Sequence, residues 1–250
     1  MKPLDLLVLL LLFKNQQRRK VVESLIKNKI RAGIFTEDLV ISTFQKHMAP
    51  LKQHTVPVLG LAESLLECSV DIVVNFTKQV YSSAFMLGVY CQQEVVGDLV
   101  AKVGAGGGGD ITKGAIDVLD QLSKQHTEVL SKYGLFLTAV LDHKERMSLG
   151  QVRKLMGILA RLAWVAGKDG VVIQDDITIV IKKQIDSSHL TLKRMGVIGA
   201  VVVVQAMVKA HSDDEEDLGE PVAESSRNNT VVLETLGGGS GASGACQIEN

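Results

Sequence analysis

The sequence predicts an all-α protein, an α-solenoid of stacked antiparallel helices. Three observations lead to this prediction. Apolar residues recur every three or four positions along most of the 250 residues. No series of short strands alternates with helices, as an α/β fold requires. Residues that typically begin and end helices flank several of the apolar segments, although no crisp sequence repeat is visible.

Residues 1–103 are predicted to form a first helical segment. Its opening apolar run, Leu4–Phe13, is interpreted as the buried face of a helix rather than as a targeting signal, because Asp5 interrupts it and no small-residue cleavage site follows. Thr36 is expected to cap a helix that runs to about Met48. Further helices are predicted over residues 21–30, 59–66, 72–90 and 92–103.

A glycine-rich loop, residues 104–109, follows this segment. It formally matches the pattern G-x-G-x-x-G, but a dinucleotide site needs a preceding strand, so we interpret the glycines as a loop between helices. Helices resume in the segment 110–210, over residues 110–122 and 127–141 and after a capping box formed by Ser148 and Gln151. Asp175 or Asp176 is expected to cap the next helix, although the β-branched residues 177–181 also suit a strand.

Lys193 is the candidate functional residue of this second segment. Ser187 and Ser188 can each cap a helix that starts near His189, which places Lys193 about one turn in. From the residues alone, the simpler interpretation is a lysine whose side chain reaches out of a core helix into solvent.

The residues after Lys193 predict close helix packing. Gly196 and Gly199 lie three positions apart on one face, where the missing side chains let another helix approach. Ala200–Val204 is apolar on all sides and is expected to be buried. Together with Ile198, the two glycines are expected to seat the helix that presents Lys193.

The charges of the chain are balanced in number but uneven in position. With 27 Lys and Arg against 28 Asp and Glu, no bulk field predicts nucleic-acid binding. Basic residues are concentrated near the start of the chain. A solvated helix face is the simpler interpretation of this basic stretch, and contact with DNA phosphates is the functional one. The candidate phosphate contacts are Lys14, Arg18, Arg19, Lys20, Lys27 and Arg31.

No residue pattern indicates catalysis. The 3 cysteines and 6 histidines are scattered, without the spacing of a zinc site or of a nucleophile with its base. We therefore expect no catalytic residue, no metal site, no cofactor and no enzymatic activity. Residues 211–250, acidic and then rich in glycine and serine, are predicted to be a disordered tail.

Several stretches in order resemble the family of Fanconi anaemia group D2 proteins. The longest is IQDDITIVIKKQIDSSHLTLKRMGVIGAV, which is similar to the family's segment around its ubiquitin-acceptor lysine. The resemblance covers roughly residues 4–210, and members of the family are several-fold longer, so this chain is expected to be an internal segment. The other stretches are NKIRAG, residues 42–68, YCQQEVVGDLV and QVRKLMGILARLAW.

This resemblance implies a function. It implies a non-enzymatic subunit of interstrand-crosslink repair, located in the nucleus on chromatin, whose Lys193 accepts one ubiquitin that locks the protein onto DNA. The partners that it implies are the Fanconi anaemia group I protein as the other half of a heterodimer, double-stranded DNA, ubiquitin, and the group L ubiquitin ligase with its conjugating enzyme. No membrane is expected.

Two alternatives remain at this stage. The first is a generic helical scaffold that binds proteins and has no modified lysine. The second is a membrane-anchored protein that uses Leu4–Phe13 and Met195–Val208, although both stretches are short for a bilayer span.

Overall fold

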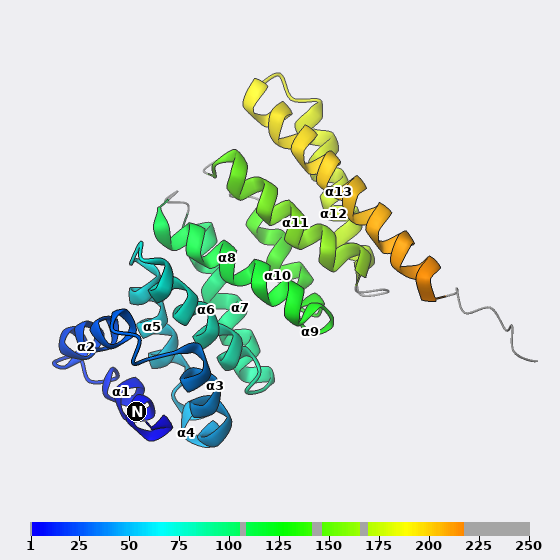
Figure 1. Ribbon diagram of the computed structural model, residues 1–250. Coiled ribbons are helices and arrows are strands. Elements are labelled where there is room, and N and C mark those ends of the chain that lie inside the picture. The colour runs from blue at the N-terminus through cyan, green and yellow to red at the C-terminus, as the bar shows by residue number, and fades with distance from the viewer. Residues whose placement is uncertain (1, 106–108, 142–146, 166–169, 218–250) are drawn as a thin grey trace, which may run out of the picture. The chain divides into compact units, whose positions relative to one another are not determined.

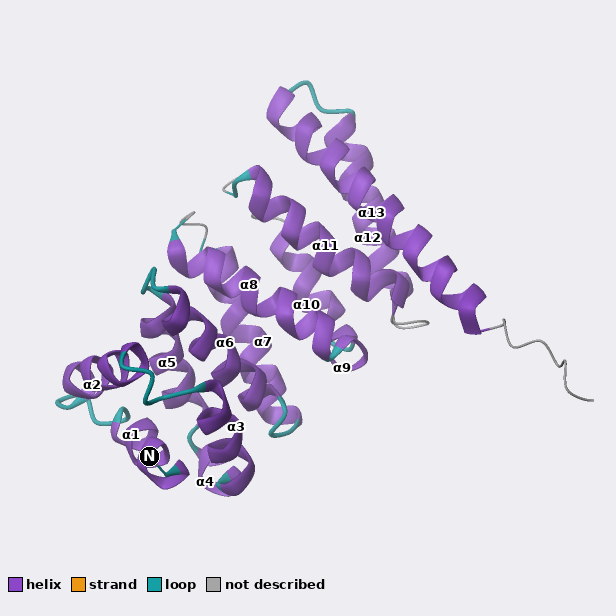
Figure 2. Ribbon diagram, viewed as in Figure 1, coloured by secondary structure: helices purple, strands orange, loops and turns teal. Residues whose placement is uncertain are grey.

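Apolar residues three and four positions apart fold most of the chain into helices. The computed structural model describes residues 2–105, 109–141, 147–165 and 170–217, and no β-strand occurs within these ranges (Figure 2). The predicted all-α class is confirmed. The helices are α1 (Pro3–Leu12), α2 (Arg19–Arg31), α3 (Glu37–Lys46), α4 (Met48–Gln53), α5 (Thr55–Leu66), α6 (Asp71–Phe85), α7 (Val89–Gly104), α8 (Asp110–Gln125), α9 (Thr127–Ser131), α10 (Gly134–Thr138), α11 (Leu149–Val165), α12 (Val171–Ile185) and α13 (Leu190–Asp217).

The chain divides into two units, residues 1–210 and residues 211–250. The first unit contains all the helices up to α13. The predicted tail at 211–250 begins inside α13, which continues to Asp217, and residues 218–250 lie outside the described residues. Of the predicted glycine-rich loop, Gly104 closes α7 and Gly109 precedes α8, whereas residues 106–108 also lie outside the described residues.

Within residues 1–210, helices that are near one another in sequence pack on one another. Thus α3 packs on α1 and α6, α8 packs on α7 and α11, and α11 packs on α12. In Figure 1 the colours of this unit accordingly pass in order from blue through green to yellow. A single set of buried side chains runs from Leu6 on α1 to Met195 on α13. This arrangement is that of an α-solenoid, as predicted.

Several predicted helix ends are confirmed by their hydrogen bonds. Thr36 Oγ1 accepts a hydrogen bond from the backbone N–H of Leu39 at 3.3 Å. In the capping box, the Gln151 N–H donates to Ser148 Oγ at 3.3 Å, and the Ser148 N–H donates to Gln151 Oε1 at 2.8 Å. Gly33 follows α2 with a φ of 67°, a conformation that glycine adopts without strain.

Two predicted helices are each divided in the structure. The helix predicted over residues 72–90 ends at Phe85, and Gly88, with a φ of 147°, turns the chain into α7. The helix predicted over residues 127–141 becomes α9 and α10. The linking residues Leu87 and Tyr133 are buried, so the apolar period continues across each break and conceals it.

The prediction that Asp175 or Asp176 caps a helix is wrong. Helix α12 starts at Val171, so both aspartates lie inside it. Its start depends on Gly170, since a Cβ atom there would lie 2.1 Å from the carbonyl oxygen of Ala163. Residues 177–181 are helical rather than extended.

Candidate functional site

Lys193 lies in the first turn of α13, where the chain has just turned back from α12. In this turn, Ser187 Oγ accepts a hydrogen bond from the backbone N–H of His189 at 3.2 Å. Helix α13 starts at Leu190, and the Lys193 N–H donates to the carbonyl oxygen of His189 at 3.0 Å. The position of Lys193 one turn into a helix is confirmed, although His189, rather than Ser187 or Ser188, directly precedes the helix.

The Lys193 side chain is exposed to solvent. Within the described part of the chain, its ammonium group takes part in no hydrogen bond or ion pair. Lys182 and Lys183, near the end of α12, are also exposed. Exposure therefore does not distinguish Lys193 from these two lysines, whereas its place at the start of a long helix does.

Gly196 and Gly199 bring α13 into close contact with α12 and α11. A Cβ atom at Gly196 would lie 2.9 Å from Cγ1 of Ile185 and 3.0 Å from its backbone nitrogen. A Cβ atom at Gly199 would lie 2.6 Å from Cε of Met156 on α11 and 3.1 Å from Cγ1 of Ile181. The predicted close approach at the two glycines is confirmed.

The opposite face of α13 is exposed. The prediction that Ala200–Val204 is buried is wrong, because α13 packs through one face only, and Val201 and Val204 remain 49% and 57% exposed. Ile198 lies between the two faces and is half-buried. The exposed valines follow one another at intervals of four, three and four residues, as in a helix-packing seam. They are Val197, Val201, Val204 and Val208.

The length of α13 also corrects the argument against a membrane span. The stretch Leu190–Ala210 contains 21 residues, is long and apolar enough to cross a bilayer, and has 17% of its most apolar window buried. The sequence-based estimate started at Met195 and was therefore too short. Length and composition alone are a weak indication, because a core helix of a water-soluble protein has the same properties.

The basic stretch lies on α2 and on the turn that precedes it, and three of its six side chains already have contacts within the protein. Arg19 Nε donates to the carbonyl oxygen of Phe13 at 3.3 Å, and its guanidinium lies 5.0 Å from the centre of the Phe13 ring. Lys27 Nζ lies 2.5 Å from Glu23 Oε1. Arg31 Nη2 lies 3.7 Å from Cys68 Sγ.

The other three basic side chains are free to meet a ligand. Lys14, Arg18 and Lys20 are exposed, and no hydrogen bond or ion pair of their side chains occurs among the described residues. Helix α2, in blue, and the start of α13, in yellow, lie at opposite ends of the helical stack formed by residues 1–210 (Figure 1). The structure therefore does not bring the predicted phosphate contacts and Lys193 into one site.

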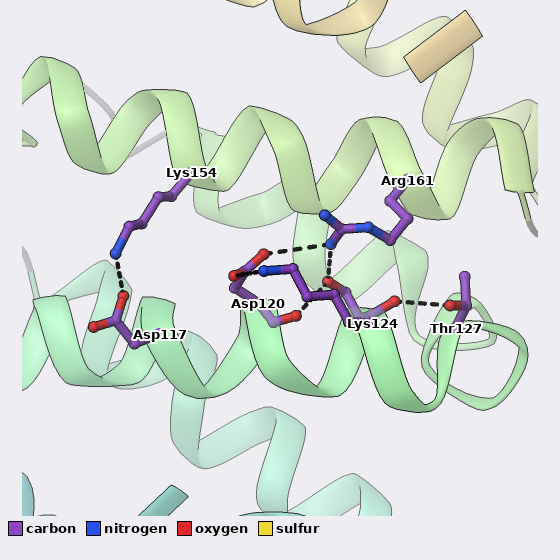
Figure 3. Close-up of polar contacts among 7 residues, drawn as sticks. Asp117, Asp120, Lys124, Thr127, Lys154 and Arg161 are labelled. Carbon is purple, nitrogen blue, oxygen red and sulfur yellow. Dashed lines mark hydrogen bonds and ion pairs between the residues drawn. The ribbon is translucent and has the colours of Figure 1, made fainter. Parts of the chain in front are cut away.

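A polar contact between α8 and α11 was not predicted. Figure 3 shows Lys154 above Asp117, with Nζ and Oδ1 2.5 Å apart, and Arg161 directed towards Asp120, with Nη1 and Oδ1 3.4 Å apart. Arg161 also donates to Ser123 Oγ. The seven-residue spacing of Lys154 and Arg161, together with the acidic stripe on α8, was the signal for this contact.

A second polar cluster surrounds Lys102, which is 8% exposed. Lys102 forms ion pairs with Asp98 and, at 3.5 Å, with Glu63, and the Tyr81 hydroxyl donates to Asp98 Oδ2 at 2.8 Å. Burial and the neighbouring carboxylates raise the pKa of Tyr81. The ion pair with Glu63 connects α7 to α5, and the Tyr81 hydrogen bond connects α6 to α7. Across the described ranges, no group of three or more His, Cys, Asp or Glu side chains is placed to hold a metal ion.

Comparison with known proteins gives one consistent result. Residues 1–246 match the family described as Fanconi anaemia protein FancD2 nuclease. The match is wider than the 4–210 expected from the sequence.

Curated relatives have the same name. The chain is 36% identical to the Fanconi anemia group D2 protein of Gallus gallus over 87% of this chain and 15% of that protein. It is 34% identical to the homolog of Mus musculus over 94% of this chain and 16% of that protein. With the homolog of Drosophila melanogaster it shares 23% identity over 82% of this chain and 14% of that protein. The chain thus spans only a small part of the length of these relatives.

Proposed function

This chain belongs to the family of Fanconi anaemia group D2 proteins, and on that basis we propose that it is a helical, non-enzymatic segment of a DNA-repair clamp in which Lys193 accepts a single ubiquitin. Family membership supports a role in the Fanconi anaemia pathway. The observation that carries the proposal is the position of Lys193, an exposed amine in the first turn of a helix whose other face is packed on α12 and α11.

The proposed reaction requires no catalytic group from this chain. A conjugating enzyme, guided by the group L ligase, presents ubiquitin as a thioester. The deprotonated Lys193 amine attacks the thioester carbonyl, an isopeptide bond forms and the thiol of the conjugating enzyme leaves. Lys193 is a substrate in this step, so its amine has only to be accessible to the thioester and correctly positioned.

The proposed partners are the Fanconi anaemia group I protein and double-stranded DNA, in the nucleus on chromatin. Of the basic residues on α2 and on the turn before it, Lys14, Arg18 and Lys20 are the ones whose exposed side chains suit phosphate contacts. Changing Lys20 to Ala is therefore expected to weaken duplex binding and to flatten its salt dependence, whereas Arg19→Ala, which removes the contact with Phe13, leaves that slope nearly unchanged. Equal slopes for the two variants would contradict the assignment.

The family description contains the word nuclease, and we propose that this segment does not cleave DNA. Metal-dependent cleavage needs several ligands around a divalent cation, and the described residues offer no such group. Incubating the chain with duplex DNA and Mg²⁺ or Mn²⁺ is expected to give no fragments. Fragments that disappear on addition of EDTA would show that the segment is catalytic.

Mapping of ubiquitin remnants by mass spectrometry tests the acceptor. Endogenous protein is compared from cells with and without a DNA crosslinker, and a remnant on Lys193 is expected to rise with crosslinking. Lys182 and Lys183 are the matched controls, since they are exposed on the same hairpin. If well-covered Lys193 peptides carry no remnant in either sample, the generic helical scaffold becomes the better interpretation.

A membrane anchor is the second candidate function, because Leu190–Ala210 has the length and composition of a span. Two features favour the repair segment. One face of α13 is already packed on α12 and α11, and α12 carries exposed Lys182 and Lys183, which are costly to place in lipid. Extraction of cell membranes with alkaline carbonate is expected to release the protein, whereas retention in the pellet would support the anchor.

A further inference from the structure

One buried polar side chain on α12, next to the contact with α13, has no hydrogen-bond partner among the residues that the structure describes. Gln184, near the end of α12, is 4% exposed, and both its Nε2 and its Oε1 are buried without a partner. Among the described residues, no other buried side chain carries such atoms. Folded proteins pair nearly all their buried polar groups, so an unpaired carboxamide disfavours the arrangement that buries it.

The first turns of α13 form part of that arrangement. A Cβ atom at Gly196 would lie 3.0 Å from Cβ of Gln184, so the α13 backbone passes directly over this side chain. Met195, the residue before Gly196, is 2% exposed, and Lys193 lies about one turn before Gly196. The turn that carries Lys193 therefore packs on α12 next to the unpaired carboxamide of Gln184.

The rest of the α13 contact is of a different kind. At Gly199, one turn further on, the helix meets the apolar side chains of Met156 and Ile181. On the other side, the turn that connects α12 to α13 is mostly exposed and contains a side-chain hydrogen bond from the His189 N–H to Ser187 Oγ. The first turns of α13 can thus unwind next to this turn while the contact at Gly199 remains.

We propose that the first turns of α13 open from α12 and that the unpaired Gln184 carboxamide sets how often they do so. In the open state, water reaches the two amide atoms and satisfies them, and in the closed state they remain unpaired. The equilibrium moves the turn that carries Lys193. It is a property of the helix contact, so it does not depend on the transfer of ubiquitin.

Hydrogen–deuterium exchange of the whole chain, without any partner, tests the proposal. Methionine matches the unbranched shape of glutamine and has no need of hydrogen bonds, so Gln184→Met removes the unpaired atoms with little change of volume. The backbone amides of residues 190–200 are expected to exchange roughly five- to a hundredfold more slowly in this variant, the range that an unpaired buried polar group corresponds to. Amides of α5 to α7 are expected to be unchanged.

Gln174 provides the matched control on the same helix. Its Nε2 donates to the carbonyl oxygen of Ala163 at 2.7 Å, so Gln174→Met removes a hydrogen bond that is made. This variant is expected to accelerate exchange near the start of α12. Unchanged or faster exchange over residues 190–200 in Gln184→Met would overturn the proposal and would leave the acceptor role of Lys193 untouched.

Discussion

The contact between α8 and α11 and the contact between α12 and α13 join neighbouring helices by different means. Across α8 and α11, Lys154 pairs with Asp117 and Arg161 pairs with Asp120 (Figure 3). Across α12 and α13, the two helix backbones approach each other closely at Gly196.

The difference shows what each contact tolerates. Long charged side chains follow small movements of their helices, so a contact such as Lys154 with Asp117 survives a shift. A contact at a glycine does not tolerate added volume, because one added methyl group at Gly196 would meet the backbone of Ile185. The packing of the hairpin that carries Lys193 therefore depends on the missing side chain at Gly196.

Adding one methyl group to the glycine contact should have the largest effect on stability. Gly196→Ala is expected to lower the free energy of unfolding by up to about 2 kcal/mol, because overpacking at Ile185 costs about 1–3 kcal/mol and the gain in helix propensity offsets about 1 kcal/mol of that cost. Gly97 on α7 has no atom within 4 Å of its Cβ position, so Gly97→Ala should raise that free energy by about 0.5–1 kcal/mol. Urea denaturation measures the free energy of unfolding of both variants. A higher value than wild type for Gly196→Ala as well as for Gly97→Ala would show that the contact at Gly196 is not tightly packed.

Removing the ion pair between Lys154 and Asp117 should lower the free energy of unfolding by less than Gly196→Ala does. In a double-mutant cycle of Asp117→Ala and Lys154→Ala, the coupling free energy is expected to be about 0.2–1 kcal/mol, because the Lys154 side chain is 50% exposed. This coupling should fall in concentrated salt, since exposed charges are screened. A coupling that exceeds the loss caused by Gly196→Ala would reverse the comparison.

The smallest effect is expected from pH, and it should arise at the end of α8 rather than at α13. His126 follows α8 and stacks on Phe85 with ring centres 6.0 Å apart, and burial lowers the pKa of His126 below 6.5. The unfolded chain then binds the proton more readily, so this contribution to stability is complete above pH 6.5 and is lost as the pH falls through the lowered pKa.

The measurement is the urea midpoint of the wild-type chain and of His126→Phe between pH 7.5 and 5.5. Phenylalanine keeps the stacking on Phe85 but cannot bind a proton, so the variant should lose less stability on acidification. Parallel pH profiles for the two proteins would show that His126 contributes nothing to the pH dependence.

Much of the fold and part of the candidate site could be predicted from local patterns. The hydroxyl of Thr36 and the pair Ser148 and Gln151 make the expected caps, because a cap depends on residues within one turn. The same holds for the start of α13 near Lys193. The breaks at Gly88 and Tyr133 could not be predicted, because buried residues continue the apolar period across them.

The amino-acid order was sufficient for the helical class, for the place of Lys193 one turn into a helix and for the close approach at Gly196 and Gly199, since each depends on neighbours along the chain. Which face of a helix is covered depends on what packs against it. Only the folded chain therefore shows that Val201 and Val204 are exposed, that Gln184 is buried without a partner, and that Arg19 is bound to Phe13 rather than free for DNA.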